Sequence, residues 1–318
     1  MYVRAGIDLG TSKVCASVDT RGEWFNVVIP AYVGDMGGWQ DWHKGDIAVR
    51  VGNDYKYVGD VVLRMSEVKG NYLKDDKMKR PTLKPLLHAL LGAVAHKMDT
   101  KSLEMDIVAT LPFDASEKQK LEMTQMLKGV RNTDCIIEGV HHTANVKINR
   151  VEIKPEGLCS WFNYVLDDYG KVKKENLASK MALVVCLGLY HLNLVMVDAG
   201  RLIGPPVSRS LPYGLSLAHE AICRKEDGAE MWEVDKLLRE GRLDGSEAFA
   251  KLADQVNTAI DNLLSRQTRK PDLYYATGGG GIAVYKWLKQ NDKIASPSPV
   301  TDDAEGARKI AVALWPQA

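Results

Sequence analysis

A short polar segment near the start of the chain has residue types that suit the binding of a phosphate group and a hydrated cation: Asp8-Leu9-Gly10-Thr11-Ser12-Lys13. The apolar, β-branched residues on either side of it predict two strands joined by this turn. Its glycine permits a tight turn and close approach of a ligand, and its two hydroxyls can donate to phosphate oxygens. Its lysine can neutralise charge, and its aspartate suits hydrated Mg²⁺. Taken alone, the segment fits an ordinary Gly-Thr-Ser hairpin turn equally well.

A run of four glycines forms a second candidate ligand-binding segment: Tyr275-Ala276-Thr277-Gly278-Gly279-Gly280-Gly281. Consecutive glycines cost backbone entropy, so such a run indicates that something passes close to the main chain. A flexible linker is the alternative. We favour a ligand such as a nucleotide, because the run lies between a predicted strand and a predicted helix, whose N-terminus attracts anions.

The first segment has an internal counterpart later in the chain. Residues 7–14 and 185–192 occupy the same place in two strand-turn-strand units. Any two hairpins share apolar flanks, but these two also share a glycine at the start of the turn and an Asp-to-Gly exit from the second strand. This pattern favours a duplication and predicts two halves that face each other across a cleft.

The elements that must position these segments follow from hydrophobic periodicity and turn residues. Beyond the two hairpins, strands are predicted at 24–29, 47–51, 55–58, 105–111, 146–153 and 273–276. Helices are predicted at 86–97, 116–127, 155–166, 215–224, 231–238, 246–265, 283–288 and 303–314. This alternation indicates an α/β protein.

Composition excludes several classes of protein. The chain has 318 residues, a net charge of +1, 45% apolar and 26% charged residues, which predicts about two globular domains. Near-neutrality argues against a nucleic-acid binder, and we read the basic run from Lys74 to Lys84 as solvated surface.

Five scattered cysteines indicate reduced thiols without a disulfide framework or zinc site. The sequence shows no signal peptide and no membrane span, so we expect a cytoplasmic protein that does not contact membranes.

Taken together, the two glycine-bearing segments resemble the phosphate and adenosine loops of the actin, sugar-kinase and heat-shock-chaperone superfamily of ATPases. Within it, the chain is most similar to the ParM-like (StbA) bacterial and archaeal actins. The segments that carry this resemblance, in order, are Tyr57-Val58-Gly59-Asp60, Ala109-Thr110-Leu111-Pro112, Lys154-Pro155-Glu156-Gly157, the helical stretch from Val234 to Gly241, and Asp303-Ala304-Glu305-Gly306.

The resemblance implies an actin-like, ribonuclease H-like duplicated α/β fold with a nucleotide cleft between two domains. Domain I would span 1–154, with a small insertion at about 30–85, and the C-terminal helix at 303–318 would pack back onto it. Domain II would span 155–302, with a helical insertion at about 206–270.

The resemblance also implies roles for individual residues, with ATP or GTP and Mg²⁺ as ligands. Asp8 would position Mg²⁺ through water. Glu156 matches the carboxylate that orients or activates the attacking water, although alone it reads as an acid at a helix N-terminus. The residues that would bind the β- and γ-phosphates are Gly10, Thr11, Ser12 and Lys13. The glycines that would flank the adenosine are Gly278, Gly279 and Gly280. The second phosphate loop retains Gly188.

That second loop departs from the family pattern. Cys186 stands where the family has a metal-facing aspartate, and Leu189 stands where it has a second glycine. Tyr190 and His191 replace a pair of hydroxyl residues, and Asn193 replaces a later aspartate. A thiol is a poor Mg²⁺ ligand, and leucine prevents the close approach that glycine allows. We therefore expect slow or altered hydrolysis.

Three functions remain open at this stage. The first is a cytoskeletal ATPase that polymerises into filaments and segregates plasmids or organises the cell through an adaptor protein. The second is a non-polymerising or non-hydrolysing regulator with the same fold. The third, a small-molecule kinase, ranks last because the second loop offers no catalytic aspartate.

Overall fold

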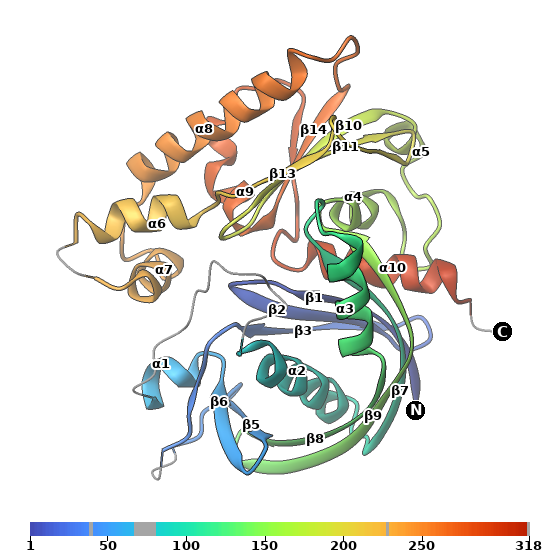
Figure 1. The fold of residues 1–318 in the computed structure, drawn as a ribbon, viewed down its shortest axis with the longest axis vertical. Helices are drawn as coiled ribbons and strands as arrows, with labels where there is room; N and C mark the ends of the chain where they lie inside the picture. The colour runs from blue at the N-terminus through green and yellow to red at the C-terminus, as the bar shows by residue number, and fades with distance from the viewer. Residues whose placement is uncertain (38–40, 67–80, 227–228, 317–318) are drawn as a thin grey trace.

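The computed structural model of the chain describes residues 1–37, 41–66, 81–226 and 229–316, and it contains two sheets (Figure 1). The first sheet has nine strands: β1 (Tyr2–Leu9), β2 (Lys13–Asp19), β3 (Trp24–Pro30), β4 (Val33–Asp35), β5 (Ile47–Val51), β6 (Asp54–Val58), β7 (Ser102–Leu111), β8 (Gly129–Ile137) and β9 (Val140–Pro155). The second has six: β10 (Met181–Leu187), β11 (Leu192–Asp198), β12 (Arg201–Ile203), β13 (Arg209–Leu211), β14 (Leu273–Thr277) and β15 (Lys293–Ala295).

The two sheets repeat one strand order. The first contains β3-β2-β1-β7-β9, and the second contains β12-β11-β10-β14-β15. In both, the first three strands are antiparallel neighbours and the last three are parallel neighbours. This common order confirms the predicted α/β fold with two duplicated halves. The first sheet extends further through β8, β5, β6 and β4, and it curls around a helix.

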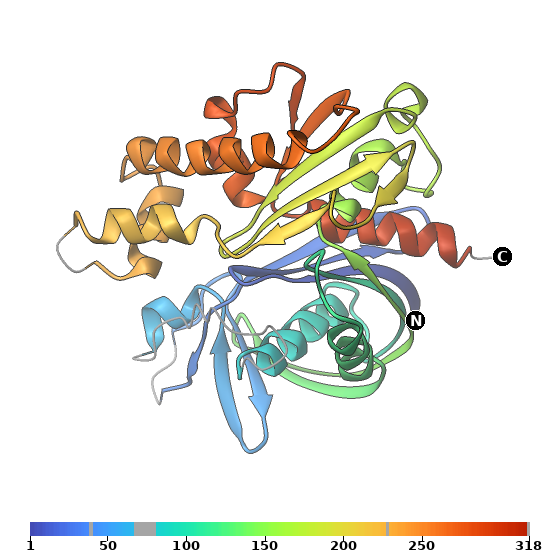
Figure 2. The same cartoon turned by 45° about the horizontal axis from the view of Figure 1, so that its top comes forward.

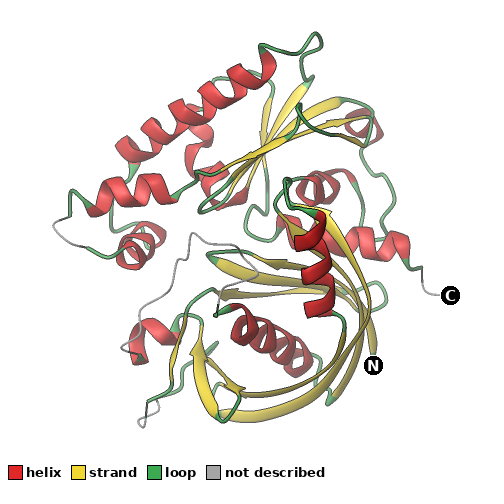
Figure 3. Cartoon of the chain, in the orientation of Figure 1, coloured by secondary structure: helices red, strands yellow, loops and turns green. Residues whose placement is uncertain are grey.

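That enclosed helix is α2 (Leu83–Lys97), which lies in the hollow of the curled sheet (Figure 3). Its leucines at 83, 86, 87, 90 and 91 follow helical spacing, and all are buried in the core of the first half. Two further helices belong to this half, α1 (Val61–Met65) and α3 (Glu117–Leu127). Ser116 begins α3 with a capping box to Gln119, which confirms the predicted helix start.

The second half has helices on both faces of its sheet. On one face lies α8 (Ser246–Leu264), whose buried Leu252, Val256 and Ile260 pack with the side chains of β10. On the other face lies α4 (Leu158–Val165), whose fully buried Trp161 packs against Tyr275. Figure 2 shows α6 (Ser216–Cys223) and α7 (Met231–Arg239) beside α8, away from the C-terminus. The remaining helical elements are α5 (Glu175–Ala178), α9 (Gly278–Val284), η2 (Tyr285–Trp287) and α10 (Asp302–Leu314).

Helix α10 contacts α4 of the second half and β1, β2 and β7 of the first. It supplies charged side chains to both ends of α4. Asp303 Oδ1 accepts hydrogen bonds from the backbone N–H groups of Gly157 (2.9 Å) and Ser160 (3.1 Å) at the N-terminus of α4. Lys309 Nζ donates to the carbonyl of Leu166 (3.0 Å) at its C-terminus. These side chains provide an acceptor for free backbone N–H groups at the N-terminus of α4 and a donor for a free carbonyl at its C-terminus.

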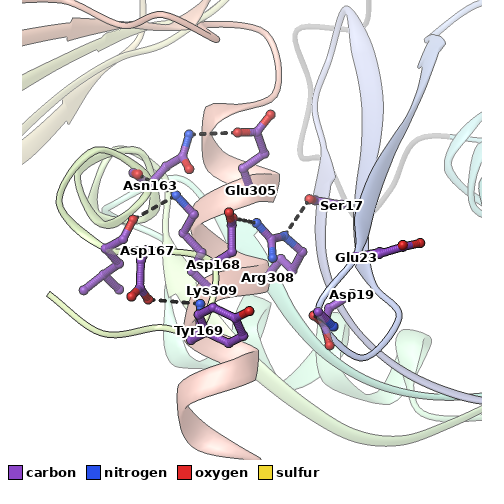
Figure 4. A network of polar contacts seen from close by, with 12 residues as sticks. Ser17, Asp19, Glu23, Asn163, Asp167, Asp168, Tyr169, Glu305, Arg308 and Lys309 are labelled. Carbon is purple, nitrogen blue, oxygen red and sulfur yellow. Dashed lines mark hydrogen bonds and ion pairs between the residues drawn. The ribbon is translucent and has the colours of Figure 1, made fainter. Parts of the chain in front are cut away.

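Between these two residues, Arg308 joins the halves through a fully buried guanidinium (Figure 4). Its Nε donates to Ser17 Oγ on β2 (3.1 Å), and its Nη2 donates to Asp168 Oδ1 beyond α4 (2.5 Å). Burial raises the pKa of Asp168, but the hydrogen bond and charge of Arg308 outweigh it and hold that pKa below its ordinary value. A buried charge is stable only when it is paired in this way, so α10 has a fixed register between the halves.

The close contacts of α10 depend on two glycines. A Cβ added at Gly6 on β1 would lie 1.9 Å from the carbonyl oxygen of Ala304, and one added at Gly306 would lie 1.8 Å from that of Cys159 on α4. Backbone atoms line both contacts, so no side chain can rotate away to make room. These glycines let β1, α10 and α4 approach within direct backbone contact.

Several local predictions need correction. The helix expected to begin at Pro155-Glu156 begins at Leu158, because β9 runs to Pro155 and Gly157 turns the chain with φ 78°. The helix expected at 283–288 begins directly at Gly278. β8 has no counterpart among the predicted strands. Residues 74–80 of the basic run lie outside the described residues.

All five cysteines are free, and no described helix is long and apolar enough to cross a membrane.

Candidate functional site

A cleft of about 340 Å³ lies between the two halves, where the turns of the hairpins β1–β2 and β10–β11 meet the start of α9. This volume falls within the range of small-molecule sites. The sequence-predicted residues that line it are Asp8, Gly10, Thr11, Ser12, Lys13, Glu156, Gly188, Gly278 and Gly279. The structure therefore brings together segments that lie up to 271 residues apart in the numbering, from Asp8 to Gly279.

The first hairpin presents its carboxylate and its cation to the cleft. Asp8 is the penultimate residue of β1, and its Oδ1 accepts a hydrogen bond from Thr110 Oγ1 on β7 (2.8 Å). A Cβ at Gly10 would lie 2.6 Å from the carbonyl oxygen of Lys13, so the tight turn itself requires this glycine. Burial in the cleft lowers the pKa of Lys13, and the nearby charge of Arg239 lowers it further.

The second hairpin presents a more apolar wall. The N–H of Gly188 donates to the carbonyl of His191 (2.9 Å) and closes the turn. The carbonyl oxygens of Gly188 and Leu189 accept hydrogen bonds from the backbone N–H groups of Leu215 (3.0 Å) and Ser216 (2.8 Å) at the start of α6, and these bonds fix the turn. Leu189 and Tyr190 line the cleft and are each only 7% exposed. This wall differs from the glycine and hydroxyl pair that the family pattern places here.

The glycines of α9 have different surroundings. Gly278 has φ +77°, and a Cβ there would lie 2.5 Å from the carbonyl oxygen of Leu187. Gly280 does not line the cleft, because it packs against Leu187, which would lie 2.8 Å from an added Cβ. An added Cβ at Gly279 meets nothing within 4 Å. Part of the glycine run is thus explained by contact with β10, whereas Gly279 leaves open space on the cleft side.

Three carboxylates surround the floor of the cleft, those of Asp8, Glu156 and Asp303. Burial raises the pKa of Asp303, and the negative charges of Asp8 and Glu156 raise it further. Burial also raises the pKa of Cys186 well above its ordinary value, and Asp303 adds to this effect. The thiol at this position is therefore neutral at physiological pH. The concentration of negative charge favours a cation in the cleft.

Glu156 is fixed by two contacts. Its backbone N–H donates to the carbonyl of Leu111 (2.7 Å), and its Oε2 accepts a hydrogen bond from Asn193 Nδ2 (3.1 Å). Asn193 is 1% exposed, and its Oδ1 accepts from Ser210 Oγ (2.8 Å). An amide can donate to the carboxylate of Glu156, whereas the aspartate of the family pattern would repel it. The substitution at 193 therefore orients Glu156.

Sequence reasoning assigned no site role to Asp303 or Thr110, and it named Asn193 only as a departure from the second phosphate loop. The motif Asp303-Ala304-Glu305-Gly306 was a signal for the first of these, because it supports the family resemblance. Nothing in local spacing links Asp303 or Thr110 to the cleft. Thr110 reaches Asp8 only because β7 pairs in parallel with β1.

The halves also touch beyond the cleft. Tyr32 Oη donates to Asp235 Oδ2 on α7 (3.4 Å), and Trp232 of α7 packs against the apolar cluster that contains Val61 and Val62 of α1. A second cavity of about 520 Å³ lies between α1 and α7. This contact links Tyr32 and α1 of the first half to α7 of the second.

The cleft fits a phosphate-bearing ligand with a hydrated cation. Gly279 leaves space that a Cβ would occupy, and a Cβ at Gly188 would make only an ordinary contact of 3.5 Å. Lys13 and the turn of the first hairpin can neutralise phosphate charge. In the described part of the chain, no group of three or more His, Cys, Asp or Glu side chains is placed to hold a metal alone. Mg²⁺ usually keeps several of its waters and shares ligand phosphates, so it needs few ligands from a protein.

A known family matches the N-terminal half of the chain. Residues 6–158 match the family described as the N-terminal domain of actin-like proteins. The N-terminal half of the chain is therefore an actin-like N-terminal domain. No curated protein matches the sequence.

Solved structures show how far the actin-like fold extends along the chain. A 15-stranded ParM filament from Clostridium botulinum has a TM-score of 0.77 at 18% identity, covering 98% of this chain and 99% of that one. ParM of Bacillus thuringiensis with ATP has a TM-score of 0.65 at 15% identity, covering 98% of each chain. An archaeal actin homologue has a TM-score of 0.71 at 16% identity, covering 97% and 99%. These likenesses confirm an actin-like two-domain fold over nearly the whole chain.

Proposed function

We propose that this actin-like protein binds ATP or GTP with Mg²⁺ in the cleft and assembles with copies of itself into filaments. The observation that carries the proposal is that the first hairpin turn, Glu156 and the glycines of α9 line a single cleft. The fold similarity to a ParM filament and to a ParM with ATP supports it.

The proposed site divides between the two halves. Asp8 faces the hydrated Mg²⁺, and the turn from Gly10 to Lys13 binds the β- and γ-phosphates. Gly279 leaves room for the nucleoside at the N-terminus of α9, where the helix dipole favours phosphate. Glu156, oriented by Asn193, holds a water molecule for attack. Mg²⁺, when bound, neutralises the charge that develops on the phosphates.

Filament assembly follows from the position of the ligand between the halves. We place domain I at 1–154 and domain II at 155–302, with α10 returning to contact both. A ligand that binds residues from both domains favours the arrangement in which they close around it. Closed subunits would then stack head to tail, an arrangement that forms an open filament. We propose that the filaments segregate a plasmid or organise the cell interior through an adaptor protein.

Hydrolysis is proposed to be slow. The second hairpin has the buried Leu189 in place of a glycine, and it has Tyr190, whose hydroxyl donates to Met231 Sδ (3.9 Å), in place of a small hydroxyl residue. Fewer donors to the terminal phosphate mean less stabilisation of the charge that develops during transfer. This observation also favours a second candidate, a polymer or regulator that binds nucleotide without hydrolysing it. Measurement of phosphate release from the wild type and from Leu189→Gly separates these two candidates. Release from the wild type that becomes faster in the variant indicates slow hydrolysis. No release from either protein indicates a protein that binds nucleotide without hydrolysing it.

Polymerisation is tested by high-speed sedimentation with negative-stain microscopy. We expect pelleted protein and filaments with ATP or GTP and Mg²⁺, and with a non-hydrolysable analogue, but not without nucleotide. Lys13→Ala in the first hairpin should abolish pelleting, whereas Lys44→Ala, an exposed lysine that does not line the cleft, should not change it. Absence of filaments with every triphosphate would refute the filament and leave nucleotide binding to be judged separately.

A further inference from the structure

The duplicated sheets give Asp8 and Cys186 equivalent positions. Asp8 is the penultimate residue of β1, and Cys186 is the penultimate residue of β10. Each strand continues into the turn of its hairpin, and both residues line the cleft. The first half therefore contributes a carboxylate at this position, whereas the second half contributes a neutral thiol. Compared with the first half, the second half therefore lacks a carboxylate at this position of the cleft.

A carboxylate from another element lies beside that thiol. Asp303 of α10 lines the cleft, and its Oδ2 is 3.8 Å from Cys186 Sγ. Its Oδ1 accepts hydrogen bonds from Gly157 and from the backbone and hydroxyl groups of Ser160 (2.8–3.1 Å). One oxygen thus caps α4, and within the described part of the chain the other has the Cys186 thiol as its hydrogen-bond partner.

We propose that Asp303 supplies the second cation-facing carboxylate of the cleft in place of residue 186, so that this charge has moved from β10 to α10. The inference rests on the proposed function, because the cation is the Mg²⁺ of a bound nucleoside triphosphate. The cysteine belongs to the same arrangement. An aspartate at 186, so close to Asp303 Oδ2, would place two carboxylates in contact, and like charges at that separation repel.

A purely structural role for Asp303, as the cap of α4, makes a different prediction. Asp303→Asn keeps a carbonyl oxygen that can accept from Gly157 and Ser160, and removes only the charge. If Asp303 is a cap alone, this variant should bind the nucleotide like the wild type. If Asp303 faces the cation, the variant should lose the part of nucleotide affinity that depends on Mg²⁺.

The experiment is calorimetric titration of ATP into the full-length protein, with Mg²⁺ and with EDTA. The dissociation constant in EDTA divided by that in Mg²⁺ measures how much Mg²⁺ strengthens nucleotide binding. We expect Asp303→Asn to reduce this ratio about tenfold, which is typical for an outer-shell carboxylate. Asp303→Asn combined with Cys186→Asp should recover it, because the charge returns to β10. Asp114→Asn, which removes a carboxylate elsewhere on the cleft wall, is the matched control and should leave the ratio within about twofold.

An unchanged ratio in Asp303→Asn, or no recovery in the double variant, overturns the inference while leaving the proposed function intact. Absence of ATP and GTP binding by the wild type instead overturns the proposed function. If Asp303→Asn does not fold, Cys186→Asp alone tests the same geometry. Its melting temperature in EDTA should fall below that of the wild type and rise when MgCl₂ is added. A melting temperature in EDTA equal to the wild type would contradict the proposal.

Discussion

Two adjacent glycines on α9 should respond oppositely to the same substitution. In Gly280→Ala, the new Cβ would lie 2.8 Å from Leu187 Cγ and 2.9 Å from its carbonyl oxygen. Overpacking of this kind costs about 1–3 kcal/mol, or about 2–10 °C in melting temperature. In Gly279→Ala, the Cβ meets nothing within 4 Å, and alanine favours a helix by about 0.4–1 kcal/mol. The melting temperature of this variant should therefore be unchanged or higher by about 1–3 °C.

Nucleotide affinity should fall in Gly279→Ala, the variant whose melting temperature is expected to be unchanged or higher. The methyl group of Gly279→Ala occupies cleft space, and a clash of about 1.4 kcal/mol or more with the ligand weakens binding about tenfold or more. Differential scanning fluorimetry without ligand and calorimetric titration with ATP and Mg²⁺ measure both quantities. If Gly279→Ala binds ATP as tightly as the wild type, the nucleoside does not lie at the start of α9 and the site is misplaced.

Three further predictions concern α10 and the cleft floor. Gly306→Ala should lower the melting temperature by about 6 °C or more, because its Cβ meets the backbone of α4 at 1.8 Å, whereas Gly204→Ala, in open space, should not. Burial lowers the pKa of Lys309 to about 8, so between pH 8 and its ordinary value near 10.5 the unfolded chain binds more protons and stability rises with pH. The melting temperature of the wild type relative to Lys309→Met should therefore increase across that window, and a constant difference would show that Lys309 does not titrate there. Asn193→Asp should place two carboxylates 3.1 Å apart and slow phosphate release about tenfold with little change in ATP affinity, and an unchanged rate would remove Glu156 from the hydrolytic step.

Local sequence signals were sufficient for the hairpins and most helices. The strands on either side of Gly10 and Gly188 are bounded by turn residues, and their continuous apolar character marks them as buried. The same holds for the start of α3, where Ser116 and Gln119 form the capping box within four residues. These elements depend on neighbours in the sequence, so the pattern predicts them.

Contacts between distant segments were not predictable in this way. Asp303 reaches Gly157 across 146 residues of sequence, and only the crossing of α10 over α4 places it in the cleft. Gly280 illustrates the same limit, because the backbone that approaches it belongs to Leu187 rather than to a ligand. A glycine run shows that something lies close to the main chain, whereas tertiary packing decides what it is.

The central claim is that the cleft between the two hairpins binds a nucleoside triphosphate with Mg²⁺. Calorimetric titration of the full-length protein with ATP and with GTP, each in the presence of Mg²⁺ and of EDTA, tests it most directly. We predict one site per chain for at least one of the two nucleotides, with binding weakened by EDTA and by Lys13→Ala. No measurable binding of either nucleotide in the presence of Mg²⁺ would contradict the account.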